Sequence, residues 1–174
     1  MGASADKRRG FLGMATRRPL NVTEELVEVF DECGRVTEYL VSVVPFRLWY
    51  LPPPTGHGRT IAAIVAHIHG LRKMIAKMGG APVGPSLDRK TVTPAEAKRA
   101  LRQINETLTT MFRESLGRGE GRVKGISRRI VNIMHYLIQH DAHHRGQLMW
   151  LARDLGHEFA TIDTMKIWGW KKLS

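Results

Sequence analysis

The sequence predicts an all-α protein, a four-helix bundle whose helices are joined by long loops. Four segments carry apolar residues at steps of three and four, which is the period of an amphipathic helix. Stretches rich in glycine and proline separate these segments, and no segment has a convincing strand pattern. Helices that each have one apolar stripe bury those stripes against one another, so four of them form a bundle.

The first predicted helix begins at Asn21 and ends at Pro45. Asn21 and Glu24 have the spacing of a capping box, and a proline cannot continue a helix. Cys33, the only cysteine, is expected to be an inert core residue on this helix. The residues expected to face the core are apolar and follow the helical period: Leu26, Val29, Phe30, Cys33, Val36, Val43 and Val44.

A long apolar connection follows, over residues 46–59. It contains Trp49, Tyr50 and three consecutive prolines, Pro52, Pro53 and Pro54, which favour an extended chain. The segment is expected to pack against the bundle. Two roles remain open for it: it covers one end of the bundle, or its aromatic residues wall the entrance to a functional site.

The second predicted helix covers residues 60–78. At about 100° per residue, His67 lies about 60° from the centre of the apolar stripe, whereas His69 lies about 140° away and is expected to face outward. After a loop at 79–85, Thr93, Pro94 and Glu96 form a strong helix start for a third helix that reaches about Leu116. Residues 117–121 break the chain before a fourth helix at 126–155.

The fourth predicted helix carries two histidines on its buried side. His140 and His144 lie about 60° and 20° from the centre of its stripe, and residues four apart share one face of a helix. His143 and Arg145 lie at larger angles, nearer the rim or the solvent. Two readings are open for the inward pair: hydrogen-bonded core histidines, or metal ligands that His67 completes to a set of three.

The neighbouring polar residues are weighed as partners of such a site. Asp141 is expected on the surface or as a hydrogen-bond partner of a ligand, and Gln147 is the better candidate for that partner role. Arg145 could hold a substrate carboxylate near a metal, or form a salt bridge, for example to Asp141 one turn back. His143 is a candidate proton shuttle, so Arg145 and His143 are the candidate catalytic residues.

At these residues the chain resembles the DinB-like (DinB/YfiT) superfamily. The stretch from Thr60 to Ile68 resembles its second helix, and His140 to Gln147 resembles its fourth, which typically reads His-x-x-x-His-Arg-Gly-Gln. The late Trp168-Gly169-Trp170 is similar to the way many members end, and the resemblance covers nearly the whole chain after the first twenty residues.

The resemblance implies a four-helix bundle in which the second and fourth helices are neighbours. It also implies a divalent metal, most often nickel or zinc, with iron or manganese as alternatives, held by His67, His140 and His144. Relatives include S-transferases and isomerases that use low-molecular-weight thiols such as mycothiol, bacillithiol or glutathione. The resemblance thus implies a small-molecule substrate and a metal-dependent thiol transferase, or a related hydrolase or isomerase.

The charge of the chain favours a rival function. It has 27 Lys and Arg residues against 16 Asp and Glu residues, a net charge of +11, which raises the hypothesis of a non-catalytic bundle that binds protein or nucleic acid. Aromatic residues for base stacking are missing between Arg118 and Arg129, so nucleic acid is the less favoured partner. A basic cluster surrounds the last inter-helix turn: Arg113, Arg118, Arg122, Lys124, Arg128 and Arg129.

The chain is expected to have one domain, at residues 21–174, after a flexible basic tail at 1–20 in which Met14 is an alternative start. No apolar run approaches the roughly 20 residues that span a membrane, and no secretory signal is found. A cytoplasmic location is therefore expected. Such bundles commonly pair through helices, so a homodimer is expected, with a monomer as the alternative.

Overall fold

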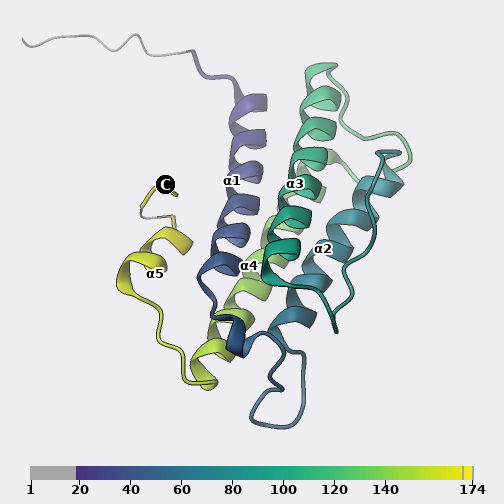
Figure 1. Cartoon of the computed structure of the whole chain (residues 1–174). Coiled ribbons are helices and arrows are strands. Elements are labelled where there is room, and N and C mark those ends of the chain that lie inside the picture. Colours follow the sequence, from purple (N-terminus) through teal and green to yellow (C-terminus); the bar gives the residue numbers. More distant parts are fainter. Residues whose placement is uncertain (1–18, 170, 174) are drawn as a thin grey trace, which may run out of the picture.

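The computed structural model describes residues 19–169 and 171–173, and Figure 1 shows that helices dominate this part of the chain. The all-α class is confirmed, with no strand among the described residues. Most of the predicted basic tail, residues 1–18 with Met14, lies outside them, as does Trp170. In chain order the elements are α1 (Val22–Val43), the 3-10 helix η1 (Phe46–Leu48), α2 (Ile61–Met78), α3 (Pro94–Gly117), α4 (Ile130–Asp154) and α5 (Thr161–Ile167).

Helices α1 to α4 form the bundle, in which α1 and α2 each pack against both α3 and α4. In Figure 1, α1 and α4 run downward while α2 and α3 run upward. This down-up-up-down order requires the connection between α2 and α3, residues 79–93, to return along the length of the bundle. Helices α2 and α4 are neighbours, so residues from the two can share one site.

The helix starts follow the predicted capping chemistry. The Asn21 side chain accepts hydrogen bonds from the backbone N–H groups of Thr23 and Glu24. Thr93 and Glu96 form a complete capping box, in which the Glu96 carboxylate accepts from the Thr93 backbone N–H at 2.8 Å. Each such cap satisfies donors that the first turn of a helix leaves without a partner.

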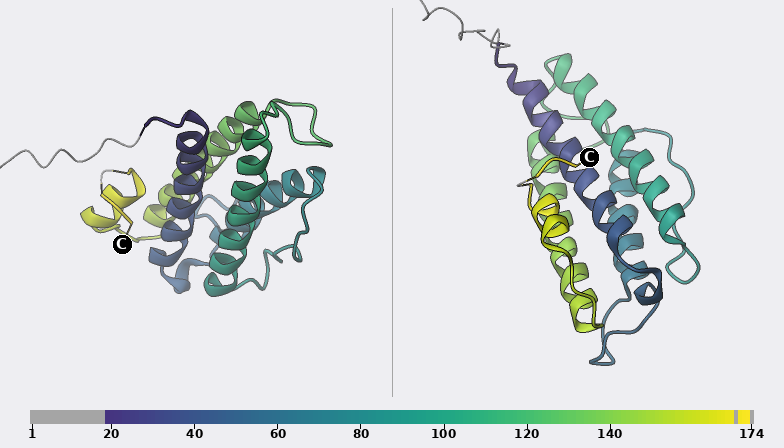
Figure 2. Two further views of the ribbon diagram at one scale, coloured as in Figure 1. Left: turned by 90° about the horizontal axis from the view of Figure 1, so that it is seen from above. Right: turned by 60° about the vertical axis from the view of Figure 1, so that its left-hand side comes forward.

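Three expectations about the helices were wrong. The helix predicted at 126–155 begins at Ile130, because Val123 and Ile126 are buried in a non-helical turn and extend the apolar pattern beyond the helix. Val29 is 56% exposed, and Val27 takes the buried position. The fifth helix, α5, was not predicted. It lies outside the four-helix bundle and contacts α1 (Figure 2).

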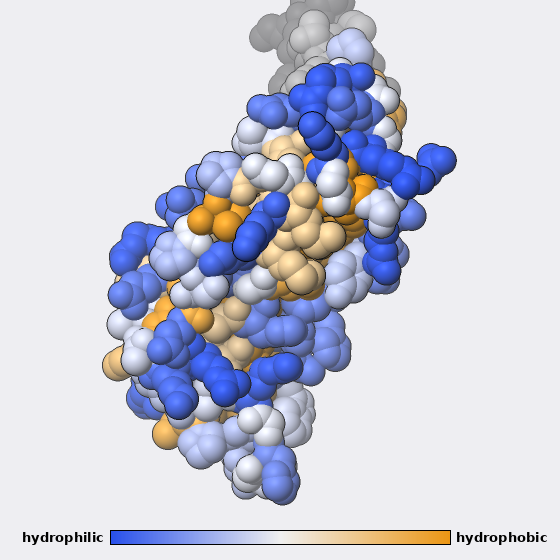
Figure 3. Space-filling view, turned by 90° about the vertical axis from the view of Figure 1, so that its right-hand side faces the viewer, coloured by the Kyte–Doolittle hydropathy of each residue, from blue (hydrophilic) through white to orange (hydrophobic). Residues whose placement is uncertain are grey.

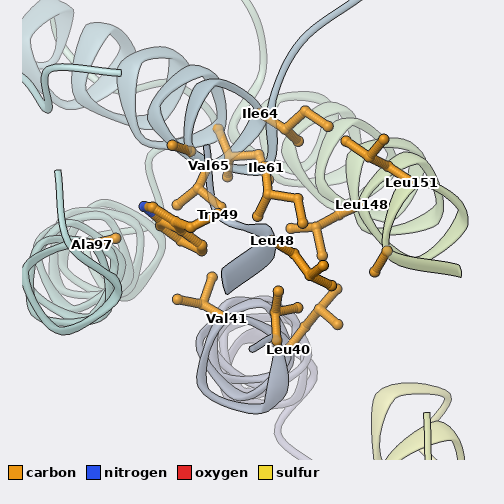
Figure 4. Close-up of a cluster of buried hydrophobic side chains, with 14 of the residues drawn as sticks. Leu40, Val41, Leu48, Trp49, Ile61, Ile64, Val65, Ala97, Leu148 and Leu151 are labelled. Carbon is orange, nitrogen blue, oxygen red and sulfur yellow. The ribbon is translucent and has the colours of Figure 1, made fainter. Parts of the chain in front are cut away.

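The apolar connection after α1 closes one end of the bundle. Trp49 directly follows η1, is fully buried, and packs among side chains of α1, α2, α3 and α4 (Figure 4). Its indole N–H donates to the Val92 carbonyl at 2.6 Å, and the Tyr50 hydroxyl donates to the same oxygen at 2.6 Å. Of the two predicted roles for this segment, Trp49 fulfils the covering one.

The core consists of two apolar clusters with a polar layer between them. One cluster surrounds Trp49, and the other contains Phe30 and Phe112, whose rings meet edge to face. Each of the four bundle helices has buried polar side chains at or next to the point where its residues pass from one cluster to the other: Thr37, Arg72, Asn105, Asp141 and His144. A polar layer inside a bundle needs matched partners across helices, so it fixes how the helices align.

The surface is largely hydrophilic. The face seen in Figure 3 shows apolar residues gathered in its middle and charged or polar residues around them. Among the described residues, no helix combines the length and the apolar character that spanning a bilayer requires.

Candidate metal centre

Three histidines from two helices converge on one point beside the polar layer. His67 comes from the second turn of α2, and His140 and His144 face it from the middle of α4. One ring nitrogen from each lies within 4.8 Å of the others, and Nε2 of His67 is 3.2 Å from Nε2 of His140. The structure thus brings together the three residues that were predicted as ligands.

The geometry of these nitrogens fits a shared metal ion. Imidazole nitrogens bind zinc at about 2.0–2.1 Å, so two adjacent ligands of one ion are roughly 2.8–3.4 Å apart, from octahedral to tetrahedral geometry. The observed 3.2 Å falls in this range. Three histidines leave coordination positions for water or substrate, which is the arrangement of catalytic rather than structural sites. The group could therefore hold a metal ion.

Gln147 orients one of the three rings, as predicted. Its side-chain Oε1 lies 2.8 Å from Nδ1 of His144, and its Nε2 lies 2.9 Å from Nε2 of His143. If Nδ1 of His144 donates to the amide oxygen, the unprotonated Nε2 is left to face the other histidines. His143 itself is exposed, and besides Gln147 its ring contacts that of His144, with the ring centroids 5.0 Å apart.

Asp141 is fully buried, so the expectation of a surface position was wrong. Its Oδ2 pairs with Nη2 of Arg72 at 2.8 Å and accepts from Nε of Arg72 at 3.0 Å. Its Oδ1 lies 3.5 Å from Nδ1 of His140, at the outer limit of a hydrogen bond. Asp141 therefore occupies the alternative position that was predicted for it, next to a ligand.

The buried network around Arg72 was not predicted, because the side chains that pair with Arg72 lie on other helices. Arg72 follows Ile68 by four residues and precedes Ile75 by three, so it stands within the apolar stripe of α2. A charge on a buried stripe needs a buried partner, and this was the signal in the sequence. Nη1 of Arg72 donates to Oδ1 of Asn105 at 2.6 Å, and the Asn105 amide donates to Asp31 at 2.8 Å.

The electrostatics of the site favour neutral histidines and an ionised carboxylate. Burial lowers the pKa of His67 and of His144, and neighbouring charges, including that of Arg59, lower both further. Burial by itself would raise the pKa of Asp141, but the Arg72 charge, together with hydrogen bonds from His140 and Arg72, outweighs this and holds the pKa below its ordinary value. Neutral imidazoles are the form that binds metal.

Arg145 does not face the three histidines. Its Nη1 donates to Oγ1 of Thr37 at 3.1 Å and lies 3.3 Å from both the carbonyl oxygen and the sulfur of Cys33. Both partners are on α1, so the side chain joins α4 to α1. The predicted salt bridge to Asp141 is not among the ion pairs of the described residues, although the Arg145 charge helps to lower the pKa of that carboxyl.

His69 is 5% exposed, and the outward position predicted for it was wrong. It lines a cavity of about 380 Å³ between α2, α3 and the connection at residues 79–93. The angular prediction assumed that α2 buries a single stripe, but the returning connection covers a second side of this helix. His69 is therefore buried on a different face from His67.

An open cleft of about 740 Å³ lies next to the histidine cluster. None of the three histidines lines it, but two residues that do, His143 and Gln147, contact His144. One wall comes from residues 53–59 of the connection after η1, and the opposite wall comes from His143, Gly146, Gln147 and Trp150 of α4. Arg145 does not line it. The wall from the connection is not formed by Trp49 or Tyr50, as one reading had predicted, but by its later, polar part.

The predicted basic cluster at the last inter-helix turn is partly neutralised. Arg113 pairs with Glu24 at 3.3 Å and Arg118 pairs with Glu120 at 2.9 Å, while Arg122 donates to the Ser127 carbonyl. Each of these contacts uses donors that a phosphate would otherwise need.

The fold and the site define a class: helical bundles with a three-histidine cluster that could hold a metal ion. The chain belongs to the DinB family, because the model of that family matches residues 21–171. The match spans all five helices of the structure. Neither the curated proteins nor the solved structures contain a match to this chain.

Proposed function

We propose that the protein binds one divalent metal ion through His67, His140 and His144 and uses it in a reaction of a small molecule. The observation that carries this proposal is the convergence of one ring nitrogen from each of the three histidines, all within 4.8 Å of one another. A pair of hydrogen-bonded core histidines would need no third ring at the same point, whereas here His144 places one there.

The reaction class that we propose is transfer by a low-molecular-weight thiol. A bound ion would lower the pKa of a coordinated thiol and so supply a thiolate nucleophile. The chain contributes the remaining functions: Gln147 and Asp141 orient two of the rings, and the cleft admits a molecule from the solvent. His143 is the candidate proton shuttle, since it is exposed and lines the cleft.

Nickel and zinc are the ions that we propose first, with iron and manganese as alternatives. Imidazole nitrogen suits zinc, nickel and iron, whereas manganese prefers oxygen ligands. The carboxylate nearest to the cluster, Asp141, is committed to Arg72 and faces Nδ1 of His140, so it is not placed as a ligand.

Elemental analysis of the purified protein tests the metal site. We expect about one divalent ion per chain, and we expect His67→Ala, His140→Ala and His144→Ala each to lose it. The matched control is His135→Ala, an exposed histidine on the same helix, which should keep the ion. Circular dichroism verifies that each variant is folded. A folded wild-type chain that takes up no nickel or zinc when dialysed against either ion would contradict the proposal.

Thermal unfolding tests the thiol separately. A ligand that binds only the folded state at a hundred times its Kd adds about 2.7 kcal/mol to the free energy of unfolding. For a chain of this size that is a rise of roughly 5–10 °C in the midpoint. We expect glutathione, mycothiol or bacillithiol to produce such a rise in the metal-loaded protein and not in the His140→Ala variant. If none does, the transferase is ruled out while the metal site stands.

A homodimer remains a prediction. The molecular mass in solution, measured by light scattering, decides between it and the monomer.

A further inference from the structure

Arg59 has a charge that no acidic residue in the described part of the chain balances. Its side chain is exposed, and among residues 19–169 and 171–173 it forms no ion pair or side-chain hydrogen bond. It is close enough to the histidines that its charge lowers the pKa of both His67 and His144. A guanidinium in this position is available to a ligand that approaches the three histidines.

The cleft beside the histidines contains cationic and neutral polar groups but no carboxylate. Arg59, His57 and His143 line it, and no Asp or Glu residue is among its lining. An anion inside it would therefore meet attraction from Arg59 and no opposing acidic side chain. Arginine binds planar carboxylates through two parallel N–H donors, which is geometry that a lysine lacks.

Much of the remaining lining of the cleft is apolar. Ile64 and Leu151 line it together with Trp150 of α4, which is 63% exposed. An exposed tryptophan next to aliphatic side chains provides a surface for an apolar or aromatic group at little conformational cost. The cleft thus combines one cation with an apolar wall, and its lining residues His143 and Gln147 contact His144 of the candidate metal centre.

We propose that this cleft binds a small organic carboxylate with an apolar body, and that Arg59 is the residue that selects its charge. The carboxylate pairs with the Arg59 guanidinium, the apolar body lies against Trp150 and Leu151, and the far end of the molecule is left beside the three histidines. This inference rests on the proposed function, since it describes the substrate of the same site. It replaces Arg145, which faces α1, as the carboxylate-binding residue.

Calorimetric titration with two matched probes tests the proposal. Phenylacetate carries the carboxylate and phenylacetamide is its neutral counterpart of similar shape. We expect the wild-type protein to bind phenylacetate more tightly, and Arg59→Gln to lose about tenfold or more of that affinity while its affinity for phenylacetamide stays the same. The matched control is Arg129→Gln, an exposed arginine at the start of α4 outside the cleft, which should behave as wild type.

A second variant separates the two halves of the cleft. Trp150→Ala should weaken both probes by a similar factor, because it removes apolar contact and leaves the charge in place. Equal affinities of the wild-type protein for the two probes would overturn the proposal. So would unchanged phenylacetate binding in Arg59→Gln.

The titrations are made on both metal-free and zinc-loaded protein, so that the two proposals fail in different ways. A carboxylate can bind a metal directly, but the difference between wild type and Arg59→Gln in the metal-free protein depends on Arg59 alone. If the protein binds no metal, this difference remains measurable. If it binds metal and the difference is absent, only the carboxylate proposal falls.

Discussion

The two carboxylate oxygens of Asp141 have different partners. Oδ2 is held by Arg72 and accepts from the Thr37 hydroxyl at 3.3 Å, whereas Oδ1 faces Nδ1 of His140 at 3.5 Å. A carboxylate that accepts from the distal nitrogen of a ligating imidazole fixes its tautomer and raises its basicity. The buried ion pair with Arg72 therefore places a negative charge behind one of the three candidate metal ligands.

Replacing Asp141 with Asn tests this role. The amide keeps the shape of the side chain but loses the charge behind His140, so we expect metal affinity to fall by about 10- to 100-fold. Competition with a chelator of known affinity measures the change. The variant also leaves Arg72 without its counter-ion, which costs about 3–5 kcal/mol of folding stability, so the measurement is made where circular dichroism shows folded protein.

The control for this variant is Asp163→Asn. It removes a carboxylate that accepts from the Tyr39 hydroxyl and that lies on α5, a different helix from those of the three histidines. It should leave metal affinity unchanged. An Asp141→Asn protein that binds metal as tightly as wild type would show that Asp141 serves only the ion pair.

At the level of single residues, the sequence was sufficient to predict the positions of side chains that follow one helical stripe. His67, His140 and His144 lie where the angular arithmetic placed them, and Gln147 lies one turn from its partner. Asp141 and His69 could not be placed in this way, because their burial depends on Arg72 and on the connection at 79–93. The same holds for Arg59, whose position depends on how a loop folds back.

Helices α1 and α3 approach each other closely at Gly34. A Cβ atom at this position would lie 2.0 Å from Oδ1 of Asn105. The Asn105 side chain cannot move away freely, because it is hydrogen-bonded to Arg72 and Asp31. The glycine therefore allows α3 to bring its amide into the polar layer. It is one of the places where the choice of residue on one helix determines the distance to the next.

Gly34→Ala should therefore destabilise the protein, although alanine is the better helix former by about 1 kcal/mol. Overpacking of this kind costs about 1–3 kcal/mol. The matched control is Gly70→Ala on α2, where a Cβ meets nothing within 4 Å, and this variant should gain up to about 1 kcal/mol. Urea unfolding measures both. Equal stabilisation of the two variants would contradict the close approach.

At the level of whole elements, the capped starts of α1 and α3 were predictable because the residues that set them are local. The starts of α4 and α5 were not predictable. The start of α4 has no side-chain cap, and the buried turn before it carries the same apolar pattern as the helix. Helix α5 also has no side-chain cap. Its Asp163 contacts Tyr39 of α1, a residue far from it in the sequence.

The stability of the whole molecule should depend on pH through His69. Burial, aided by the charge of Lys73, lowers the pKa of His69 to about 4, against 6.5 as its ordinary value. Between these values the unfolded chain binds a proton that the folded protein excludes. The free energy of unfolding therefore decreases as the pH falls from about 6.5 towards 4, and the loss levels off below that.

Urea unfolding of metal-free protein at several pH values measures this dependence. We expect a weaker dependence on pH over that range in His69→Gln than in wild type. His135→Gln, which replaces an exposed histidine, is the control and should keep the wild-type slope. The same slope in both variants would mean that His69 is protonated in the folded protein as readily as in the unfolded chain.

The segment from Trp49 to Thr60 is held at both ends. Trp49 is buried in the core and its carbonyl accepts from the Ala62 N–H at 3.0 Å, while Thr60 caps α2. Between these anchors lie Pro52, Pro53 and Pro54, whose φ angles are restricted. The wall of the cleft thus has few alternative conformations to lose when a ligand arrives, so binding costs little conformational entropy. Replacing Pro52 and Pro54 with serine would weaken binding without removing any contact to the ligand, since neither of them lines the cleft.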